Sequence, residues 1–367
     1  MNIRKFSNFL WFTLATVLLC HSVPVLANPE GETTGLSPRM AADYIHAVIQ
    51  ADRRVYADDI VDRLAKRTSL RATEHWKQEN TLLLPAQFLL MASKISNEGG
   101  IGMKYRLTSL WPINKKNSPK SEIERLGLQE VSKNPEEPFT WIVKVGGIWY
   151  FQAVYPDTAT SDSCASCHNQ HPDSPRNDFK LGDVMGGILI NLPLGRHGKK
   201  SESEKNMLPP EVVSDYVHSI LEADRTIYSK HVVDRLKNNN IMEASEHWWL
   251  ENSLPLPAQF LLKASQLVEK NRAGVDFRLI SLWPIHSRNG PANEFERKGL
   301  EFIDIHPVRP FIGKTRIGKK QFFQAIYPDF AVTPGCVQCH NSHPKSPRKD
   351  FKLNDVMGGI VVTLDLK

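Results

Sequence analysis

The stretch Cys-Ala-Ser-Cys-His occupies residues 164–168, and Cys-Val-Gln-Cys-His occupies residues 336–340. This Cys-x-x-Cys-His spacing is the attachment signature of c-type haem. The two cysteines form thioethers with the two vinyl groups of one porphyrin, and the adjacent histidine ligates the iron from the proximal side. The sequence therefore predicts two covalent haem c groups, with attachment through Cys164, Cys167, Cys336 and Cys339 and with His168 and His340 as proximal ligands.

The overall cysteine usage agrees with this prediction. The chain has five cysteines, and the fifth, Cys20, lies in an apolar N-terminal stretch. A thioredoxin-like redox pair also uses Cys-x-x-Cys, but it does not require a histidine in the next position. A four-cysteine zinc site usually joins two such pairs within about 15 to 20 residues. Here the pairs are 172 residues apart, and a zinc site would leave both histidines unexplained.

Around the two pentapeptides, the chain is one domain written twice. Adding 172 to a residue number returns its counterpart, without a gap, from Tyr44 and Tyr216 to Ile188 and Ile360. Each copy, at about 155 residues, is long enough to bury a core. The predicted organisation is a signal peptide at 1–27, a first c-type haem domain at 37–194, a linker at 195–210 and a second c-type haem domain at 211–367.

Local patterns within a copy predict helices followed by a small sheet. Ser37 and Pro38 are typical of an N-cap and a first helical residue, and apolar spacing extends this helix to about Leu64. The later predictions are a helix from Pro85 to before Gly99, a strand at 105–111, a helix at 123–131, a hairpin at 141–145 and 148–155, a haem loop, and a closing strand at 184–192. This order indicates an α+β fold of two tandem PAS/Cache-like domains, each with N-terminal helices, a small antiparallel sheet and a covalent haem loop.

Further motifs surround each pentapeptide. They are Leu-Pro-Ala at 84–86, Trp-Pro-Ile-Asn at 111–114, and a block that reads Cys-x-x-Cys-His-Asn-x-His-Pro-x-Ser-Pro and then Asp-Phe-Lys-x-Gly-Asp-Val. The block recurs in the second copy with Asn354 in place of Gly182. With these motifs, nearly all of both copies resembles the PAS-like periplasmic c-type haem domain family, formerly a domain of unknown function and also found fused to sensor histidine kinases. The resemblance implies a PAS-like fold with one haem c per copy and a role in redox or ligand sensing.

The N-terminus has the features of a secretory signal. Basic Arg4 and Lys5 precede an apolar stretch at 9–19, and Val-Leu-Ala at 25–27 predicts cleavage after Ala27. Cys20 follows two leucines, not the small residue expected before a lipoprotein cysteine. We therefore expect export to a periplasm with no membrane span after signal cleavage. An uncleaved signal that acts as a membrane anchor is the alternative.

Charge gives little indication of a polyanionic partner. The formal net charge of +6 falls to +4 once Arg4 and Lys5 are removed, and two haems would add four propionates. This balance gives no reason to expect nucleic acid. The expected partner is a redox partner protein or a separate signalling protein.

The sixth iron ligand is left open by the sequence. Members resembling this family can use a cysteine there, but the mature chain has no spare cysteine. Histidine or methionine at equivalent positions of both copies offers three pairs, and water or an open site remains a further alternative. In order of preference the pairs are His46 and His218, His75 and His247, and Met185 and Met357. Alternatively, each pair has only a structural role in packing or capping, because duplication repeats structural residues as well as ligands.

Other histidines and arginines have weaker assignments. His171 and His343 follow the proximal histidines by three residues, so we expect them to contact a propionate or the backbone on the proximal side. Three histidines of the second copy correspond to non-histidine residues in the first copy and are expected on the surface: His231, His286 and His306. The arginines repeated in both copies suit either haem propionates or ordinary salt bridges: Arg53 and Arg225, and Arg106 and Arg278.

These observations favour an exported dihaem c-type cytochrome that transfers single electrons. The alternative is a haem-based redox or gas sensor, or a ligand-binding module, that acts through a separate partner because no output segment follows the second domain before Lys367. A dihaem peroxidase needs two unlike haem sites, whereas the two motif surroundings are nearly identical. No Ser-His-Asp pattern or Gly-rich phosphate loop is evident, and we predict no catalytic residues.

Overall fold

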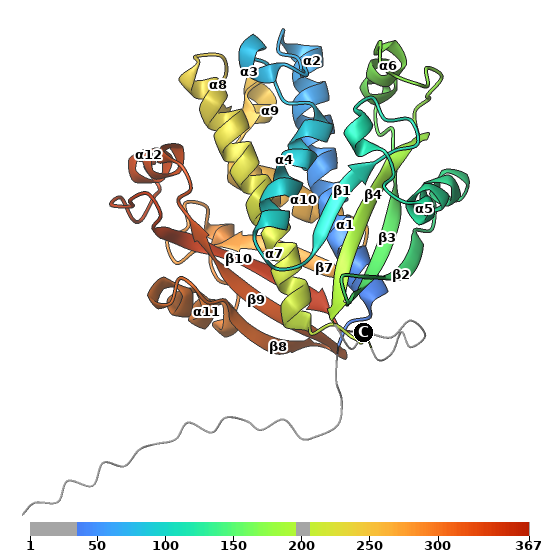
Figure 1. The fold of residues 1–367 in the computed structure, drawn as a ribbon. Coiled ribbons are helices and arrows are strands. Elements are labelled where there is room, and N and C mark those ends of the chain that lie inside the picture. The colour runs from blue at the N-terminus through green and yellow to red at the C-terminus, as the bar shows by residue number, and fades with distance from the viewer. Residues whose placement is uncertain (1–34, 196–205, 367) are drawn as a thin grey trace, which may run out of the picture. The chain divides into compact units, whose positions relative to one another are not determined.

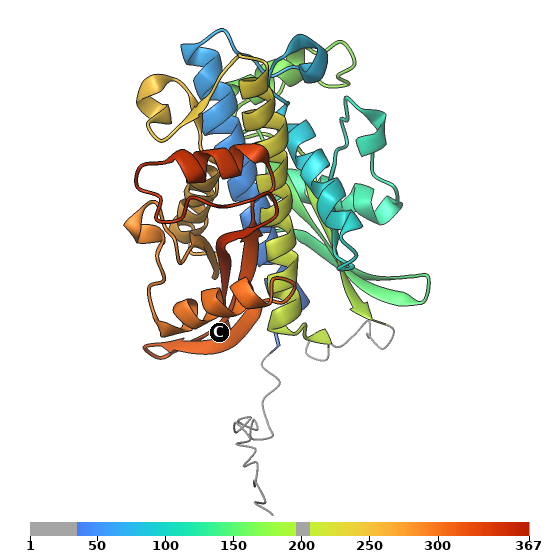
Figure 2. The ribbon, with the colours of Figure 1, turned by 90° about the vertical axis from the view of Figure 1, so that its left-hand side faces the viewer.

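The computed structural model describes residues 35–195 and 206–366. The predicted signal peptide at 1–27 and residues 196–205 of the predicted linker lie outside these residues. Four helices lie between two four-stranded sheets (Figures 1 and 2): α1 (Pro38–Arg54), α4 (Pro85–Glu98), α7 (Pro210–Ile227) and α10 (Pro257–Lys270). The predicted α+β class, with two similar halves that each combine helices and a small antiparallel sheet, is confirmed.

The first copy contains twelve named elements that form one sheet and its flanking helices. In chain order they are α1 (Pro38–Arg54), η1 (Val55–Asp62), α2 (Arg63–Arg67), α3 (Trp76–Glu79), α4 (Pro85–Glu98), β1 (Lys104–Thr108), η2 (Lys115–Asn117), α5 (Glu122–Lys133), β2 (Phe139–Val145), β3 (Ile148–Thr158), α6 (Asp162–Gln170) and, after these, β4 (Val184–Gly195). The strands pair antiparallel in the order β1-β4-β3-β2.

The second copy repeats this order with two short extra strands. Its elements are α7 (Pro210–Ile227), η4 (Tyr228–Asp234), α8 (Arg235–Asn238), β5 (Ala244–Ser245), α9 (Trp248–Glu251), β6 (Leu254–Pro255), α10 (Pro257–Lys270), β7 (Val275–Ile280), η5 (Ser287–Asn289), α11 (Glu294–Ile305), β8 (Phe311–Ile317), β9 (Lys320–Phe330), α12 (Pro334–Ser342) and β10 (Val356–Asp365). The second sheet has the equivalent order β7-β10-β9-β8.

The long first helix begins where the sequence predicts. The Ser37 hydroxyl accepts a hydrogen bond from the Met40 backbone N–H at 3.2 Å, and Pro38 occupies the first turn, where no N–H is needed. The helix then widens into the π-helical segment η1, in which the Arg63 N–H donates to the Asp58 carbonyl five residues earlier. A π-helical stretch adds residues to each turn, so η1 rotates the residues that follow it relative to the face of α1.

Two predicted boundaries differ from the structure. The strand predicted at 105–111 ends at Thr108 because the Ser109 N–H turns to the Asn117 carbonyl and no longer pairs with β4. The predicted haem loop contains a helix, α6, which includes the whole pentapeptide at 164–168. Its N-cap Ser161 and first-turn Asp162 are favourable for a helix start.

The two copies share one hydrophobic core. Helix α1 packs against α7 and α10, and α4 packs against α7. Equivalent residues meet across this interface: Leu36 and Leu208 exchange two backbone hydrogen bonds of 2.8 Å, and Phe88 contacts Phe260 with ring centroids 5.9 Å apart. Contact between a residue and its own counterpart is the signature of a two-fold arrangement. The repeat is therefore packed like a symmetric dimer within one chain.

Within the described residues, no helix combines the length and the apolar character that a membrane crossing requires.

Candidate functional site

Helix α6 places the two cysteines of the first pentapeptide one turn apart. Cys164 is half-buried and Cys167 is exposed, and both carry free thiols. The Sγ atom of Cys164 lies 3.3 Å from the Ser161 hydroxyl. In the second copy, α12 does the same for Cys336 and Cys339, with Thr333 as the capping residue. Spacing along one helix turn leaves both thiols of a pair open to reaction on the same side.

His168 and His340 follow the cysteines at the ends of these helices. The Nδ1 atom of each is buried and has no hydrogen-bond partner among the described residues. Burial is the main cause that lowers the pKa of both imidazoles below the usual value. Each ring contacts a phenylalanine edge-on at 5.9 Å, Phe179 for His168 and Phe351 for His340. A neutral imidazole is the form that ligates a metal, so both histidines are prepared for that role.

The repeated block after each pentapeptide holds this phenylalanine in place. The Asn169 amide donates to the Phe179 carbonyl and accepts from the Phe179 N–H, both at 2.9 Å. The Arg176 guanidinium lies 4.3 Å from the Phe179 ring centroid and 4.8 Å from that of Trp111. Asn341, Phe351, Arg348 and Trp283 repeat these contacts in the second copy. The block thus fixes the surroundings of the proximal histidine.

Met185 and Met357 lie in small buried clusters behind the pentapeptides. Met185 is in one cluster with Ala159, Ala165 and Phe179, and Cys164 packs against it. The Met185 carbonyl accepts from the Ser109 hydroxyl at 2.6 Å. This position is the core packing that the sequence analysis gave as the ordinary alternative for this methionine.

His46 and His218 are half-buried on α1 and α7, with the Nε2 atom of each turned away from solvent. Burial lowers the pKa of each to about 3, and the charge of Arg53 adds to the effect at His46. The Nε2 atom of each has no hydrogen-bond partner in the part of the chain that the structure describes. Each ring stacks on a tyrosine, Tyr155 at 4.0 Å for His46 and Tyr327 at 3.9 Å for His218. A buried imidazole nitrogen that has no hydrogen-bond partner can bind a metal ion.

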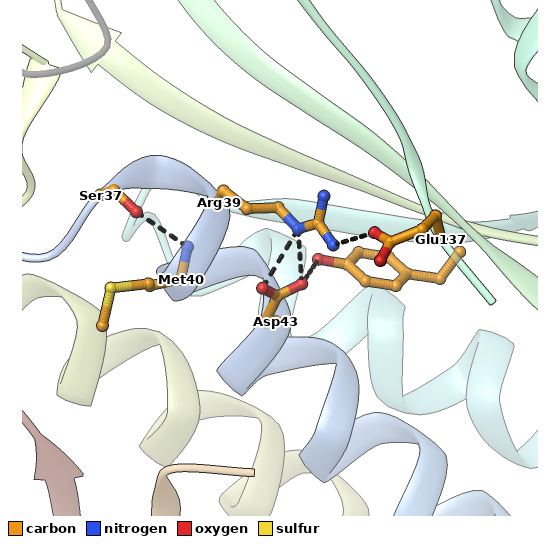
Figure 3. A network of polar contacts seen from close by, with 6 residues as sticks. Ser37, Arg39, Met40, Asp43 and Glu137 are labelled. Carbon is orange, nitrogen blue, oxygen red and sulfur yellow. Dashed lines mark hydrogen bonds and ion pairs between the residues drawn. The ribbon is translucent and has the colours of Figure 1, made fainter. Parts of the chain in front are cut away.

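A polar network holds Tyr155, the ring that stacks on His46. Figure 3 shows the part of this network made by Arg39, Asp43 and Glu137. The Tyr155 hydroxyl donates to the Asp43 carboxylate at 2.6 Å, and Asp43 accepts from Arg39 Nε at 2.9 Å. Arg39 also donates to Glu137 at 2.9 Å. In the second copy, Tyr327 donates to Asp215 at 2.7 Å. Both copies therefore fix the ring that stacks on the buried histidine.

His75 and His247 are exposed at the starts of α3 and α9. The residue before each contacts the pentapeptide region: Glu74 Oε1 lies 3.4 Å from His171 Nε2, and Glu246 Oε1 lies 3.2 Å from His343 Nε2. The loops that carry His75 and His247 therefore border the cysteine helices. His171 and His343 also make the expected backbone contact, since the Nδ1 of each accepts an N–H two residues later.

The repeated arginines are engaged in ion pairs. Arg53 pairs with Asp157 at 2.7 Å and Arg225 pairs with Asp329 at 2.9 Å, each pair nearly buried. Arg106 and Arg278 pair with Glu124 and Glu296. The salt-bridge alternative is thus the arrangement in the structure, with a partner on β3 or β9 for Arg53 and Arg225. The charge of Arg53 lowers the pKa of both His46 and His168, so both imidazoles lie within its electrostatic reach.

Two aspartates near the motifs were not singled out from the sequence. The Ser163 hydroxyl donates to Asp62 Oδ1, and in the second copy Asp234 lies against Gly335 of α12. Each aspartate lies at the end of a π-helical segment, which directs it toward its cysteine helix. Their equivalent positions in the repeat were visible in the sequence, but nothing there indicated the rotation by the π-helix.

The side chains present fit the group that the motifs predict. Each copy offers a pair of thiols one turn apart, a neutral imidazole beside them and a second buried imidazole with an orphaned nitrogen. Thiols of this spacing with nitrogen donors suit a covalent haem. In residues 35–195 and 206–366, no three His, Cys, Asp or Glu side chains gather into a metal-ion site of their own.

Comparison with known families identifies a family model that matches both copies. The family model described as Tll0287-like matches residues 34–193 and, a second time, residues 203–364. The two regions follow the 172-residue repeat and together exceed half of the chain. No curated protein matches the sequence.

Proposed function

From a chain that belongs to the Tll0287-like family in two tandem copies, we propose an exported dihaem c-type cytochrome that transfers single electrons. The observation that carries the proposal is the paired geometry of α6 and α12. In each helix two thiols lie one turn apart, next to an imidazole with a buried, unpartnered Nδ1. Bound haem would supply a one-electron iron couple at each of these places.

The residues around each site have defined roles in this proposal. Cys164, Cys167, Cys336 and Cys339 attach the two haems. His168 and His340 are the proximal ligands, and burial keeps their imidazoles neutral. His46 and His218 are the first distal candidates because their Nε2 atoms are buried without a partner. His75 and His247 are the second, because their loops border the cysteine helices.

Haem stoichiometry tests the proposal directly. We expect the pyridine haemochrome of the exported protein to give two haem c per chain. Replacing both Cys164 and Cys167 with alanine should leave one, since two thioethers hold each porphyrin. Ser166→Ala, within the same pentapeptide, is the matched control and should keep two. A wild-type chain without a c-type haemochrome signal would refute the proposal.

A haem-based redox or gas sensor that acts through a separate partner is the second candidate. The packing of the two copies around one core favours it, because a change at one site can then be transmitted to the other. Spectra with CO or NO separate the two functions. Six-coordinate spectra that do not change with either gas favour electron transfer, and ready binding favours the sensor. The periplasmic location belongs to the proposal and is checked by fractionation of cells that express the full chain.

A further inference from the structure

Arg63 of the first copy holds a loop of the second copy. It is only 5% exposed, and its Nη2 and Nη1 atoms donate to the carbonyls of Ser253 at 2.5 Å and of Trp248 at 3.4 Å. Its guanidinium also lies 4.6 Å from the Trp248 ring centroid. Trp248 begins helix α9 and Ser253 follows its end, so these contacts fix the loop at 246–253 from both sides of the helix.

Arg235 makes the mirror-image contacts. Its guanidinium donates to the carbonyls of Thr81 and Trp76, and lies 4.9 Å from the Trp76 ring centroid. In the described part of the chain, both arginines donate only to backbone carbonyls, each including one from its own helix. A guanidinium without a carboxylate partner can fix a backbone segment, because its planar group of N–H donors bonds to two carbonyl oxygens at once.

The loops held in this way border the cysteine helices of their own copies. The loop held by Arg63 carries Glu246, whose carboxylate contacts His343 at 3.2 Å. The loop held by Arg235 carries Glu74, which contacts His171 at 3.4 Å. The pKa of the Cys339 thiol is raised mainly by burial and further by Glu246, which places this carboxylate within electrostatic reach of the attachment site.

The helices that carry the two arginines also touch the cysteine helices of their own copies. Asp62, next to Arg63, accepts a hydrogen bond from Ser163 in the first turn of α6. Asp234, next to Arg235, lies against Gly335 in the first turn of α12. Figure 1 shows α2 and α3 of the first copy close to α8 and α9 of the second. Each pentapeptide is thus connected to the other by two series of contacts. One series passes through Arg63 to the second copy, and the other passes through Arg235 to the first copy.

We propose that Arg63 and Arg235 are positioning residues that make each haem site depend on the other copy. Arg63 sets the position of Glu246 beside the second pentapeptide, and Arg235 sets that of Glu74 beside the first. The proposal rests on the proposed haem function. A carboxylate beside a haem stabilises the ferric state, which carries one more positive charge than the ferrous state. Releasing either loop therefore raises the reduction potential of the haem that it borders.

Arg63→Lys in the holoprotein tests this, because it keeps the positive charge and removes the fork. We expect the equilibrium constant for reduction of the second haem to increase by at least about threefold. At about 59 mV per tenfold change for one electron, its reduction potential then rises by roughly 28 mV. The first haem should not change. Amide hydrogen exchange across 246–253 should become faster. Arg235→Lys should give the reverse, with the first haem raised and exchange faster across 74–81.

The two titration steps are assigned with the chain in which Cys336 and Cys339 are alanine, which retains the first haem. Arg54→Lys is the matched control, since this exposed arginine on the same helix bonds to Asp58 of its own copy. If Arg63→Lys does not fold, Glu246→Gln removes the carboxylate at the other end of the same connection, at a half-exposed residue. This substitution should raise the reduction potential of the second haem only.

Unchanged potential of the second haem and unchanged exchange in Arg63→Lys would overturn the proposal, as would an equal shift at both haems. Absence of haem c from the wild-type protein would instead refute the proposed function. In that case, hydrogen exchange alone still decides whether Arg63 holds the loop.

Discussion

The proximal side of each site could be predicted at the level of single residues, and the distal side could not. Covalent attachment imposes a fixed spacing, so Cys164, Cys167 and His168 are recognisable from five residues of sequence. A distal ligand is set by tertiary packing alone. His46 lies more than a hundred residues earlier, and only the structure shows that its Nε2 is buried without a partner.

Replacement of the buried histidines tests the distal assignment. His46→Gln should change the low-spin spectrum of one haem, because a glutamine side chain is a poor substitute for an imidazole ligand. His218→Gln should do the same for the other haem. Electronic absorption and electron paramagnetic resonance of the ferric protein give the measurement. His75→Gln, at an exposed position, is the matched comparison. A spectrum that changes only in His75→Gln would transfer the assignment to that pair.

At the scale of the elements, sequence patterns located most helices and strands but missed two local changes. Apolar spacing predicted a helix from Pro38 to about Leu64, and the structure extends it through α2. The π-helical segment η1 within it leaves no clear pattern in apolar spacing over so few residues. It nevertheless decides that Asp62 meets α6 and that Arg63 meets the other copy.

The paired glycines near the start of each closing strand, β4 and β10, give a prediction at this scale. A Cβ atom on Gly186 would lie 2.6 Å from the Thr108 carbonyl oxygen, and Gly358 is similarly close to the Ile280 carbonyl. Gly186→Ala should therefore push β4 away from β1 and lower the free energy of unfolding by about 1–3 kcal/mol. Denaturant unfolding followed by circular dichroism measures this loss.

Gly182→Asn is the control for that substitution. Gly182 has φ +86°, but no atom lies near its Cβ position, and its counterpart Asn354 adopts φ 69° in the second copy. Asparagine tolerates the left-handed region better than other side chains. A loss in Gly182→Asn as large as that in Gly186→Ala would show that backbone conformation, not close approach of the strands, explains the glycines.

At the scale of the whole molecule, the duplication was evident from the sequence, but the relation between the copies was not. A repeat of 172 residues predicts two similar halves whether or not they touch. The structure joins them through one core and through reciprocal arginine contacts. His231, expected on the surface, is half-buried and lies edge-on to Trp76 of the first copy at 5.7 Å. Long-range packing of this kind leaves no local pattern.

The two-fold packing also brings two buried carboxyl groups together, Asp52 of α1 and Asp224 of α7. Burial is the main cause that raises the pKa of Asp52 well above its usual value, and the charge of Asp224 adds to it. Burial raises the pKa of Asp224 to about 7. Neither Asp52 oxygen has a donor among the described residues, so a proton retained by the pair supplies the missing hydrogen bond.

This pair makes the stability of the fold decrease as the pH rises from about 4 to about 7. An unfolded aspartate ionises near pH 4, whereas the folded pair keeps a proton to higher pH, so the folded state binds more protons across this interval. Stability then falls with pH until the folded pKa is passed. Asp52→Asn should flatten this dependence and stabilise the protein at pH 7, because a neutral amide replaces a buried charge. Thermal unfolding of both proteins at several pH values measures the difference, with Asp59→Asn as control. Parallel pH profiles for wild type and Asp52→Asn would mean that the two carboxyl groups do not share a proton across the two copies.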